Sequence, residues 1–398
     1  MPAAILLPAD TRRLLALAST DRDAARAQVD ALPVERQVAL VCEAPMARRR
    51  ELLDLVSNPA LLIPELPEAE LCYTIKAIGI PDAGWIVEHA TTEQLVACVD
   101  LDAWTDLVPD TAQLGEWIRS AADAGEETLQ ALAHALDAEL LSLWLTERVE
   151  VWLKTNDDDW EPPAGSTTID GQFYQRARNE QDDLADVRAL LEVLFRNDYW
   201  FYFRLLQAVL WELQADSQEW ALRWRTGRLQ DLGFPTWDES MSIYGVVPAR
   251  LLDRLPKPEA DFQIGGWPLP VWIPRLPLSP ESGHAIFLAF AELADDERQG
   301  RLYAFLALSN RVAVADRLAL GDAESIPAAL EKAAVMTSAG LEHLARVHGV
   351  GIAEVVRRTS IEQLFRVGWT LSGEKPPYTP PEEDDEEAAN AEEASQAL

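Results

Sequence analysis

Apolar residues recur at every third or fourth position along most of this chain, which is the spacing of helices that bury one face. Two such stripes consist of Leu71, Ile75 and Ile78, and of Leu114, Trp117, Ile118 and Ala121. Between residues 60 and 153 the helix starts recur as Leu66-Pro67-Glu68, Pro81-Asp82, Thr92-Glu93 and Pro109-Asp110. A proline has no amide hydrogen to leave unpaired at a helix start, and a carboxylate there faces the positive helix end.

These short helices each have an apolar face that is too small to fold alone, so they must stack on their neighbours. Their starts are 11 to 17 residues apart. This irregular period indicates a quasi-repeat, and we expect a stacked or superhelical bundle.

Alternation of apolar and polar residues replaces the helical spacing near the middle of the chain. Residues 148–154 alternate as a half-buried strand does, and residues 167–174 contain Asp170-Gly171, a dipeptide typical of hairpin turns. We therefore expect a small antiparallel β-hairpin here. Residues 183–213 then form the clearest long helical region, with a break near Asn197-Asp198.

The last third of the chain divides into three stretches. Residues 240–282 are rich in proline but carry aromatic residues, which indicates an extended arm packed on a surface. Helices resume at about residue 283 and continue to 371. From Glu374 onward, nine acids and one lysine leave too little apolar surface for folding.

The fold class that follows is mainly α, a stacked or superhelical bundle of short helices with a small β-hairpin near the middle. A chain of 398 residues exceeds the usual size of one domain. We expect an N-terminal helical stack over residues 1–155 and a C-terminal helical domain, with the hairpin and the Pro-rich arm, over residues 156–372. A disordered acidic tail over residues 373–398 completes the prediction.

The net charge of −33 makes nucleic acids and anionic membranes poor partners, because phosphate groups would be repelled. The tail contributes eight of these charges, so most of them belong to the folded part. Two functional interpretations remain, docking onto a basic partner and mimicry of nucleic acid. The alternative to both is compositional: few lysines and many acids follow from a GC-rich genome in a salt-tolerant organism, with no bearing on function.

Three cysteines, Cys42, Cys72 and Cys98, are spaced like neither a zinc site nor a redox pair, which predicts buried free thiols. The opening apolar stretch is too short for a signal peptide, and no window is long and apolar enough for a membrane span. We expect a cytoplasmic protein.

Signatures of catalysis, cofactor binding and metal binding are absent. The chain has no Gly-x-Ser-x-Gly elbow and no phosphate-binding loop ending in Lys-Ser/Thr. His343 and His348 are five residues apart, which on a helix separates them by roughly 140° and prevents shared metal binding. We expect no cofactor and no metal, and the absence favours a non-enzyme. It excludes little, because many enzymes assemble sites from distant residues.

The one local excess of aromatic residues and arginine lies around residues 199–244, and its part at residues 220–244 gives the candidate binding residues. These are Trp220, Trp224, Arg225, Arg228, Asp231 and Tyr244. Guanidinium groups beside indoles suit the binding of a carboxylate or phosphate. The structural alternative places the tryptophans in the core, pairs the arginines with Glu219 and Asp231, and ends the helix at Gly233.

The segment Trp224-Arg-Thr-Gly-Arg-Leu-Gln-Asp-Leu-Gly-Phe-Pro235, with Ile243-Tyr244 beyond it, resembles a signature of an uncharacterised bacterial family known only as a domain of unknown function. Residues 73–79, 169–174 and 362–369 resemble it too, so the resemblance covers most of residues 8–372. It implies a helical fold and no known activity. The Leu-Pro-Glu and Pro-Asp starts are more weakly similar to helical repeats in the cytoplasmic domains of bacterial magnesium transporters and in flagellar switch proteins.

These observations lead to a cytoplasmic helical interaction or scaffold protein, whose partner is another protein bound through acidic or helical surfaces. The alternative is an enzyme or small-anion binder with its pocket at residues 220–244. A deep pocket lined by Arg225, Arg228 and indoles would favour the alternative. A broad apolar patch would favour the interaction protein.

Overall fold

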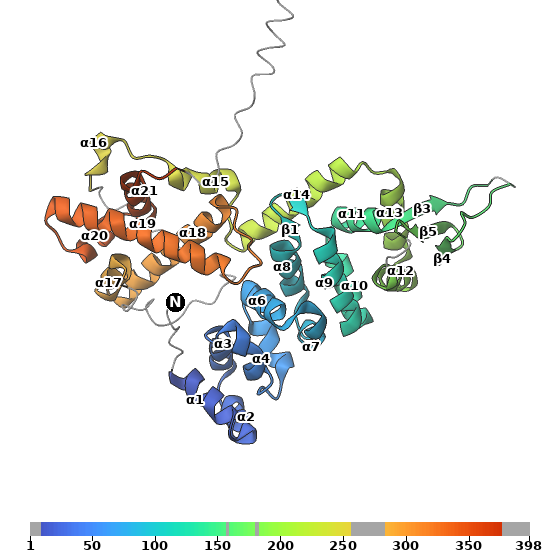
Figure 1. The fold of residues 1–398 in the computed structure, drawn as a ribbon, viewed down its shortest axis with the longest axis horizontal. Helices are drawn as coiled ribbons and strands as arrows, with labels where there is room; N and C mark the ends of the chain where they lie inside the picture. The colour runs from blue at the N-terminus through green and yellow to red at the C-terminus, as the bar shows by residue number, and fades with distance from the viewer. Residues whose placement is uncertain (1–8, 157–158, 180–182, 256–282, 376–398) are drawn as a thin grey trace, which may run out of the picture. The chain divides into compact units, whose positions relative to one another are not determined.

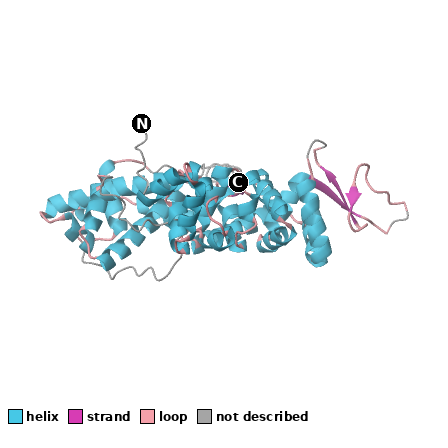
Figure 2. Cartoon of the chain, turned by 90° about the horizontal axis from the view of Figure 1, so that it is seen from below, coloured by secondary structure: helices cyan, strands magenta, loops and turns pink. Residues whose placement is uncertain are grey.

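The computed structural model describes residues 9–156, 159–179, 183–255 and 283–375 (Figure 1). Within these residues the chain forms two compact units. The first contains the described residues up to Phe234 together with 319–325, and the second contains the other described residues from Pro235 onward. Helices account for most of both units, while strands occur at only two places in the described residues (Figure 2).

The first unit is a series of short helices in which each packs on near neighbours in the sequence. Its first helices are α1 (Ala9–Ala18), α2 (Arg22–Asp30), α3 (Val34–Cys42), α4 (Met46–Leu53), α5 (Pro59–Leu62), α6 (Glu68–Ile78) and α7 (Gly84–Val87), with the 3-10 turns η1 (Ile63–Glu65) and η2 (Ile80–Asp82). Its later helices are α8 (Thr92–Asp102), α9 (Thr111–Ala124), α10 (Glu126–Ala135), α11 (Ala138–Arg148), α12 (Ala185–Asn197), α13 (Tyr199–Trp211) and α14 (Gln214–Asp231). Thus α6 packs on α8, α8 on α10, and α11 on α13 and α14.

Local chemistry explains where these helices begin. Thr91 caps α8, since its hydroxyl accepts from the amide of Gln94 while the Gln94 side chain accepts from the amide of Thr91. Asp110 caps α9 by accepting from the amide of Gln113 at 2.9 Å. The predicted break near residues 197–198 is also confirmed, because Asp198 caps α13.

The strands form two small antiparallel sheets. A two-residue ladder joins β1 (Trp104–Thr105) to β2 (Val108–Pro109), and a three-stranded sheet has the order β3 (Val149–Leu153), β5 (Phe173–Ala177), β4 (Thr167–Thr168). In the second sheet Val149 faces Ala177 and Thr168 faces Tyr174. The carboxylate of Asp170 accepts from the amides of Gln172 and Phe173, each at 2.9 Å, so the predicted hairpin turn is confirmed.

Buried acids fix several helices of the first unit. The fully buried Asp186 accepts from Arg148 of α11 at 3.1 Å and from Arg119 of α9 at 3.3 Å. Asp102 of α8 accepts from the indole of Trp117 at 3.0 Å. Each carboxylate is taken out of water, and each is stabilised there by donors from neighbouring helices.

The second unit is built around two long helices. Its elements are α15 (Trp237–Met241), η3 (Ser242–Tyr244), α16 (Ala249–Leu252), α17 (Ala285–Ala291), α18 (Asp295–Ala315), α19 (Ser325–His348), α20 (Ile352–Arg358) and α21 (Ile361–Ser372). Where α19 meets α21, Gly340 and Gly368 allow the two backbones to touch. A β-carbon built on Gly340 would lie 2.0 Å from the carbonyl oxygen of Leu364.

The mainly α fold with a small hairpin is confirmed, and the described part contains 21 α-helices. The predicted domain boundary at residues 155/156 lies inside the first compact unit, and the chain passes to the second unit at Phe234 and Pro235. The physical reason is that α12 to α14, which follow the predicted boundary, pack on α9 to α11, which precede it. Superhelical repetition stays a prediction. Most of the predicted Pro-rich arm (256–282) and the acidic tail from residue 376 lie outside the described residues.

Candidate functional site

The segment singled out in the sequence forms most of α14. One side of this helix is buried at every fourth residue, through Ser217, Ala221, Arg225 and Leu229. The helix ends where Gly233 takes a positive φ of 86°, and the amide of Phe234 donates to the carbonyl of Leu229 at 2.8 Å. This is the arrangement that favours glycine after a helix, so the predicted end is confirmed.

Arg225 is a buried link between α14 and the end of α8. Its side chain donates to the backbone carbonyl of Asp100 at 2.8 Å and to that of Asp106 at 3.3 Å. The guanidinium also lies 4.8 Å from the centre of the Trp104 ring. Burial lowers the pKa of Arg225 to about 10, with Asp100 acting in the opposite direction. The group is therefore occupied by contacts within the chain.

Arg228 bridges two carboxylates from different helices. It donates to Asp100 at 2.6 and 2.9 Å and to Asp137, just before α11, at 2.9 and 2.8 Å. Burial by itself would lower the pKa of Arg228, but the two carboxylates raise it above its usual value. Burial raises the pKa of Asp100, against the effect of Arg228 and Arg225. The fully buried carboxylate of Asp100 thus depends on the arginines to remain charged.

These partners correct the structural alternative drawn from the sequence. That alternative paired the arginines with the sequence neighbours Glu219 and Asp231, whereas Arg228 pairs with Asp100 and Asp137. The physical reason is desolvation: a buried carboxylate gains more from a cation than an exposed carboxylate, which water already solvates.

Trp220 and Trp224 are surface residues, contrary to the alternative that placed the tryptophans in the core. Their exposed fractions are 45% and 50%. Their rings stack with a centroid distance of 6.2 Å, and the guanidinium of Arg223 lies 5.1 Å from the ring centre of Trp220. They flank the buried side of α14, which is occupied by the smaller residues Ser217 and Ala221.

Tyr244, the remaining predicted site residue, belongs to the second unit. Its hydroxyl donates to Asp316, and Asp316 also pairs with Lys332 at 2.7 Å. The Lys332 ammonium lies 4.8 Å from the ring centre of Tyr244, and the ring of Trp369 lies 4.5 Å from it. Burial and the bond to Asp316 raise the pKa of Tyr244 well above its usual range.

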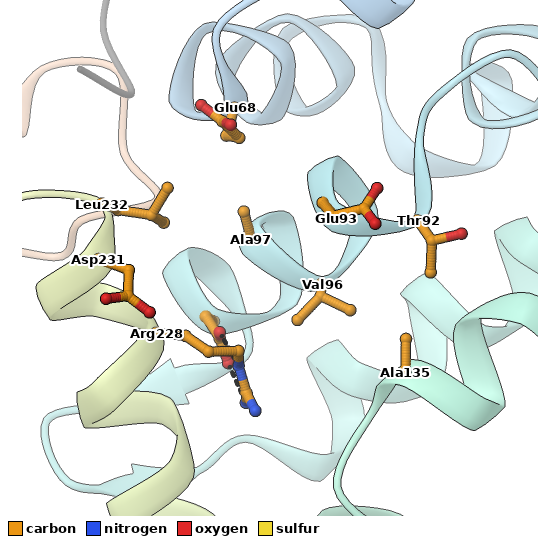
Figure 3. A pocket seen from close by; sticks show the side chains of 10 residues that line it. Glu68, Thr92, Glu93, Val96, Ala97, Ala135, Arg228, Asp231 and Leu232 are labelled. Atoms are coloured by element: carbon orange, nitrogen blue, oxygen red, sulfur yellow. Dashed lines mark hydrogen bonds and ion pairs between the residues drawn. The ribbon is translucent and has the colours of Figure 1, made fainter. Parts of the chain in front are cut away.

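A pocket of about 410 Å³ opens in the first unit between α6, α8, α10 and α14 (Figure 3). It is lined by Glu68, Thr92, Glu93, Val96, Ala97, Asp100, Ala135, Arg228, Asp231 and Leu232. Of the residues predicted from the sequence it contains Arg228 and Asp231. Its charged lining is four carboxylates and one arginine, and Figure 3 shows that arginine already bonded inside the site.

Sequence reasoning missed Glu68, Glu93 and Asp100 as lining residues. The first two were noticed only as acids at predicted helix starts, a role that they have, since both lie in the first turns of α6 and α8. The sequence around Asp100 could not identify it as a site residue, because no nearby residue indicates that its carboxylate is buried. Among the described residues, no group of three or more His, Cys, Asp or Glu could hold a metal ion.

No helix among the described residues combines the length and the apolar character required to cross a bilayer. The chain matches the model of one protein family over residues 26–374. No curated protein and no solved structure gives a significant match. The weaker similarity to repeats of magnesium transporters therefore gains no support. Given a match over most of its length, and a helical structure as the resemblance implied, the chain belongs to a family of unknown function (DUF6178).

Proposed function

We propose that the protein is a helical interaction protein that binds another protein through the face of α14 carrying Trp220 and Trp224, here called the tryptophan face. The observation that carries this proposal is the half-exposure of two stacked indoles on one helix. Tryptophan is enriched among the residues that dominate protein–protein binding energy. The exposure of a large apolar ring to water is unfavourable, so a partner that covers the ring gains binding free energy.

The support beneath the tryptophan face suits binding. Arg225 and Arg228 fix α14 to α8 and to the start of α11, so the helix is held before any partner arrives. The β1–β2 ladder packs on α14 and presents Leu107 and Val108, which are 54% and 57% exposed. A rigid apolar surface binds with less loss of conformational entropy than a flexible one.

The small-anion alternative receives less support from the same geometry. Arg225 donates to backbone carbonyls, and Arg228 bridges two carboxylates. Neither guanidinium therefore has a free pair of N–H groups that could bind a phosphate in bidentate fashion. An anion in the pocket would also face Glu68, Glu93 and Asp231. These carboxylates would repel the anion and weaken its binding.

A cytoplasmic location remains part of the proposal. Cys42, Cys72 and Cys98 are all buried and free, as expected for a protein kept in a reducing compartment.

The test begins with crosslinking and affinity capture of the full chain from its native cells, followed by identification and purification of the captured protein. Its Kd is then measured calorimetrically with Trp220→Ser, Trp224→Ser and, as a matched control, Trp200→Ser. Trp200 is an even more exposed indole on α13, at 70%. We expect each α14 variant to lose about 2 kcal/mol, roughly 30-fold in Kd, and the control to keep its affinity. Equal affinities for all four proteins would exclude the tryptophan face as the binding surface.

A further inference from the structure

The pocket beside α14 has an apolar floor and an acidic rim. Val96, Ala97, Ala135 and Leu232 supply the apolar atoms, and Glu68, Glu93 and Asp231 supply carboxylates beyond the internally paired Asp100 (Figure 3). Within the described residues, none of these three rim carboxylates has a hydrogen bond or ion pair, and the same residues contain no cluster that fits a metal ion. The chemistry of this lining therefore fits a long side chain with an apolar stem and a cationic head.

Lysine and arginine are side chains of that kind. Their methylene stems pack along apolar surface while the charged head reaches polar groups. A volume of about 410 Å³ has room for one such chain with water. The charge of the protein also favours it, because a chain of net charge −33 attracts cationic segments over long distances.

The pocket and the tryptophan face lie along the same side of α14. Asp231 follows Trp224 by seven residues, or about two helical turns, so the two side chains project in nearly the same direction roughly 10 Å apart along the axis. Trp220 precedes Trp224 by four residues and stacks on it. Gly227 stands between the indoles and Asp231, and a β-carbon there would meet no atom within 4 Å. Nothing from α14 itself separates the two features.

We propose that the partner of the tryptophan face is a basic, apolar peptide segment of another protein. Its apolar side chains cover Trp220 and Trp224, and one lysine or arginine lies across the pocket. The stem of that side chain packs on the apolar floor, and its cationic head reaches the rim carboxylates of Glu68, Glu93 and Asp231. This inference rests on the proposed function and adds the chemical class of the partner. The charge complementarity between the acidic rim and the basic segment sets which apolar segments bind.

The probe for the test is a phage-displayed library of random 12-residue peptides, selected on the full chain. The strongest peptide is then labelled, and its Kd is measured by fluorescence anisotropy, both as selected and with its lysines and arginines replaced by glutamine. The pocket variant is Glu68→Gln/Glu93→Gln/Asp231→Asn. Its matched control, Asp123→Asn/Glu127→Gln/Glu219→Gln, changes net charge equally at exposed acids outside the pocket lining. Trp220→Ser/Trp224→Ser tests the tryptophan face itself.

We expect enrichment of lysine or arginine beside aliphatic or aromatic residues. The selected peptide should bind roughly tenfold or more weakly to the pocket variant, and about as well to the control. Glutamine replacement of the peptide's basic residues should weaken binding to the unaltered protein similarly, without any change in the fold of the protein. Selection of peptides without basic residues, or equal affinities for the pocket and control variants, would overturn the inference. If the tryptophan variant alone then lost binding, the proposed function would stand; if it too bound normally, both would fail.

Discussion

Replacement of Gly340 by alanine inserts a methyl group where the backbones of α19 and α21 touch. The new β-carbon would lie 2.0 Å from the carbonyl oxygen of Leu364 and 2.9 Å from the amide nitrogen of Gly368. Ordinary contacts begin near 3.4 Å, so the helices must separate by about 1.4 Å. Both obstructing atoms belong to the backbone, and no side-chain rotation can relieve them.

The separation would loosen the packing of α21. Leu364 and Phe365 on this helix are fully buried, and Trp369 is 2% exposed. Overpacking a core costs about 1 to 3 kcal/mol, and the looser packing of these three side chains adds to that cost. We therefore expect Gly340→Ala to lower the free energy of unfolding by about 3 kcal/mol or more.

The matched control is Gly300→Ala in α18. Gly300 is exposed, and a β-carbon there would meet no atom within 4 Å. Alanine is the better helix former by about 1 kcal/mol, so this variant should be slightly more stable than the unaltered protein. Urea unfolding followed by far-UV circular dichroism measures both. If Gly340→Ala were as stable as Gly300→Ala, the close crossing of α19 and α21 would be refuted.

Three further predictions concern other buried groups. Arg228→Ala leaves the fully buried Asp100 carboxylate without its main partner, so urea unfolding should show a loss of about 3 kcal/mol, and Arg228→Lys should restore only part of it. The pKa of Tyr244 is raised, so the unfolded chain releases this proton first and stability falls as pH rises above about 10. Tyr244→Phe should therefore show a shallower decline above that pH in urea titrations, and an unchanged slope would contradict the assignment. Burial raises the pKa of the Cys42 thiol, and all three cysteines are buried, so a disulfide reagent at pH 8 should label none of them until denaturant is added.

Local features of the fold could be predicted because short-range chemistry decides them. The start of α9 at Asp110, the turn at Asp170 and the end of α14 at Gly233 each depend on one side chain bonding to nearby amides, or on one glycine adopting a positive φ. Such contacts span three or four residues and need no knowledge of the rest of the chain.

The candidate site was only partly predictable, because its bonds connect distant residues. Arg228 meets Asp100 across 128 positions and Asp137 across 91. Periodicity could not show that Trp220 and Trp224 are exposed, since the buried side of α14 is made of Ser217, Ala221, Arg225 and Leu229 and has almost no apolar pattern. The sequence pattern indicated that Glu68 and Glu93 lie at helix starts, but it could not indicate that both line the same pocket.

The sequence alone determined the mainly α-helical class, the small hairpin and several helix ends, because helix capping, turn formation and the burial of one helix face depend on residues close together in the chain. Only the tertiary structure decided which carboxylates are buried, which arginines pair with them and which indoles are exposed to solvent. Desolvation of a charge or a ring depends on what packs against it, and elements far apart in the chain supply those neighbours. The division of the chain at Phe234 and Pro235, where the sequence suggested residues 155/156, has the same origin in long-range packing.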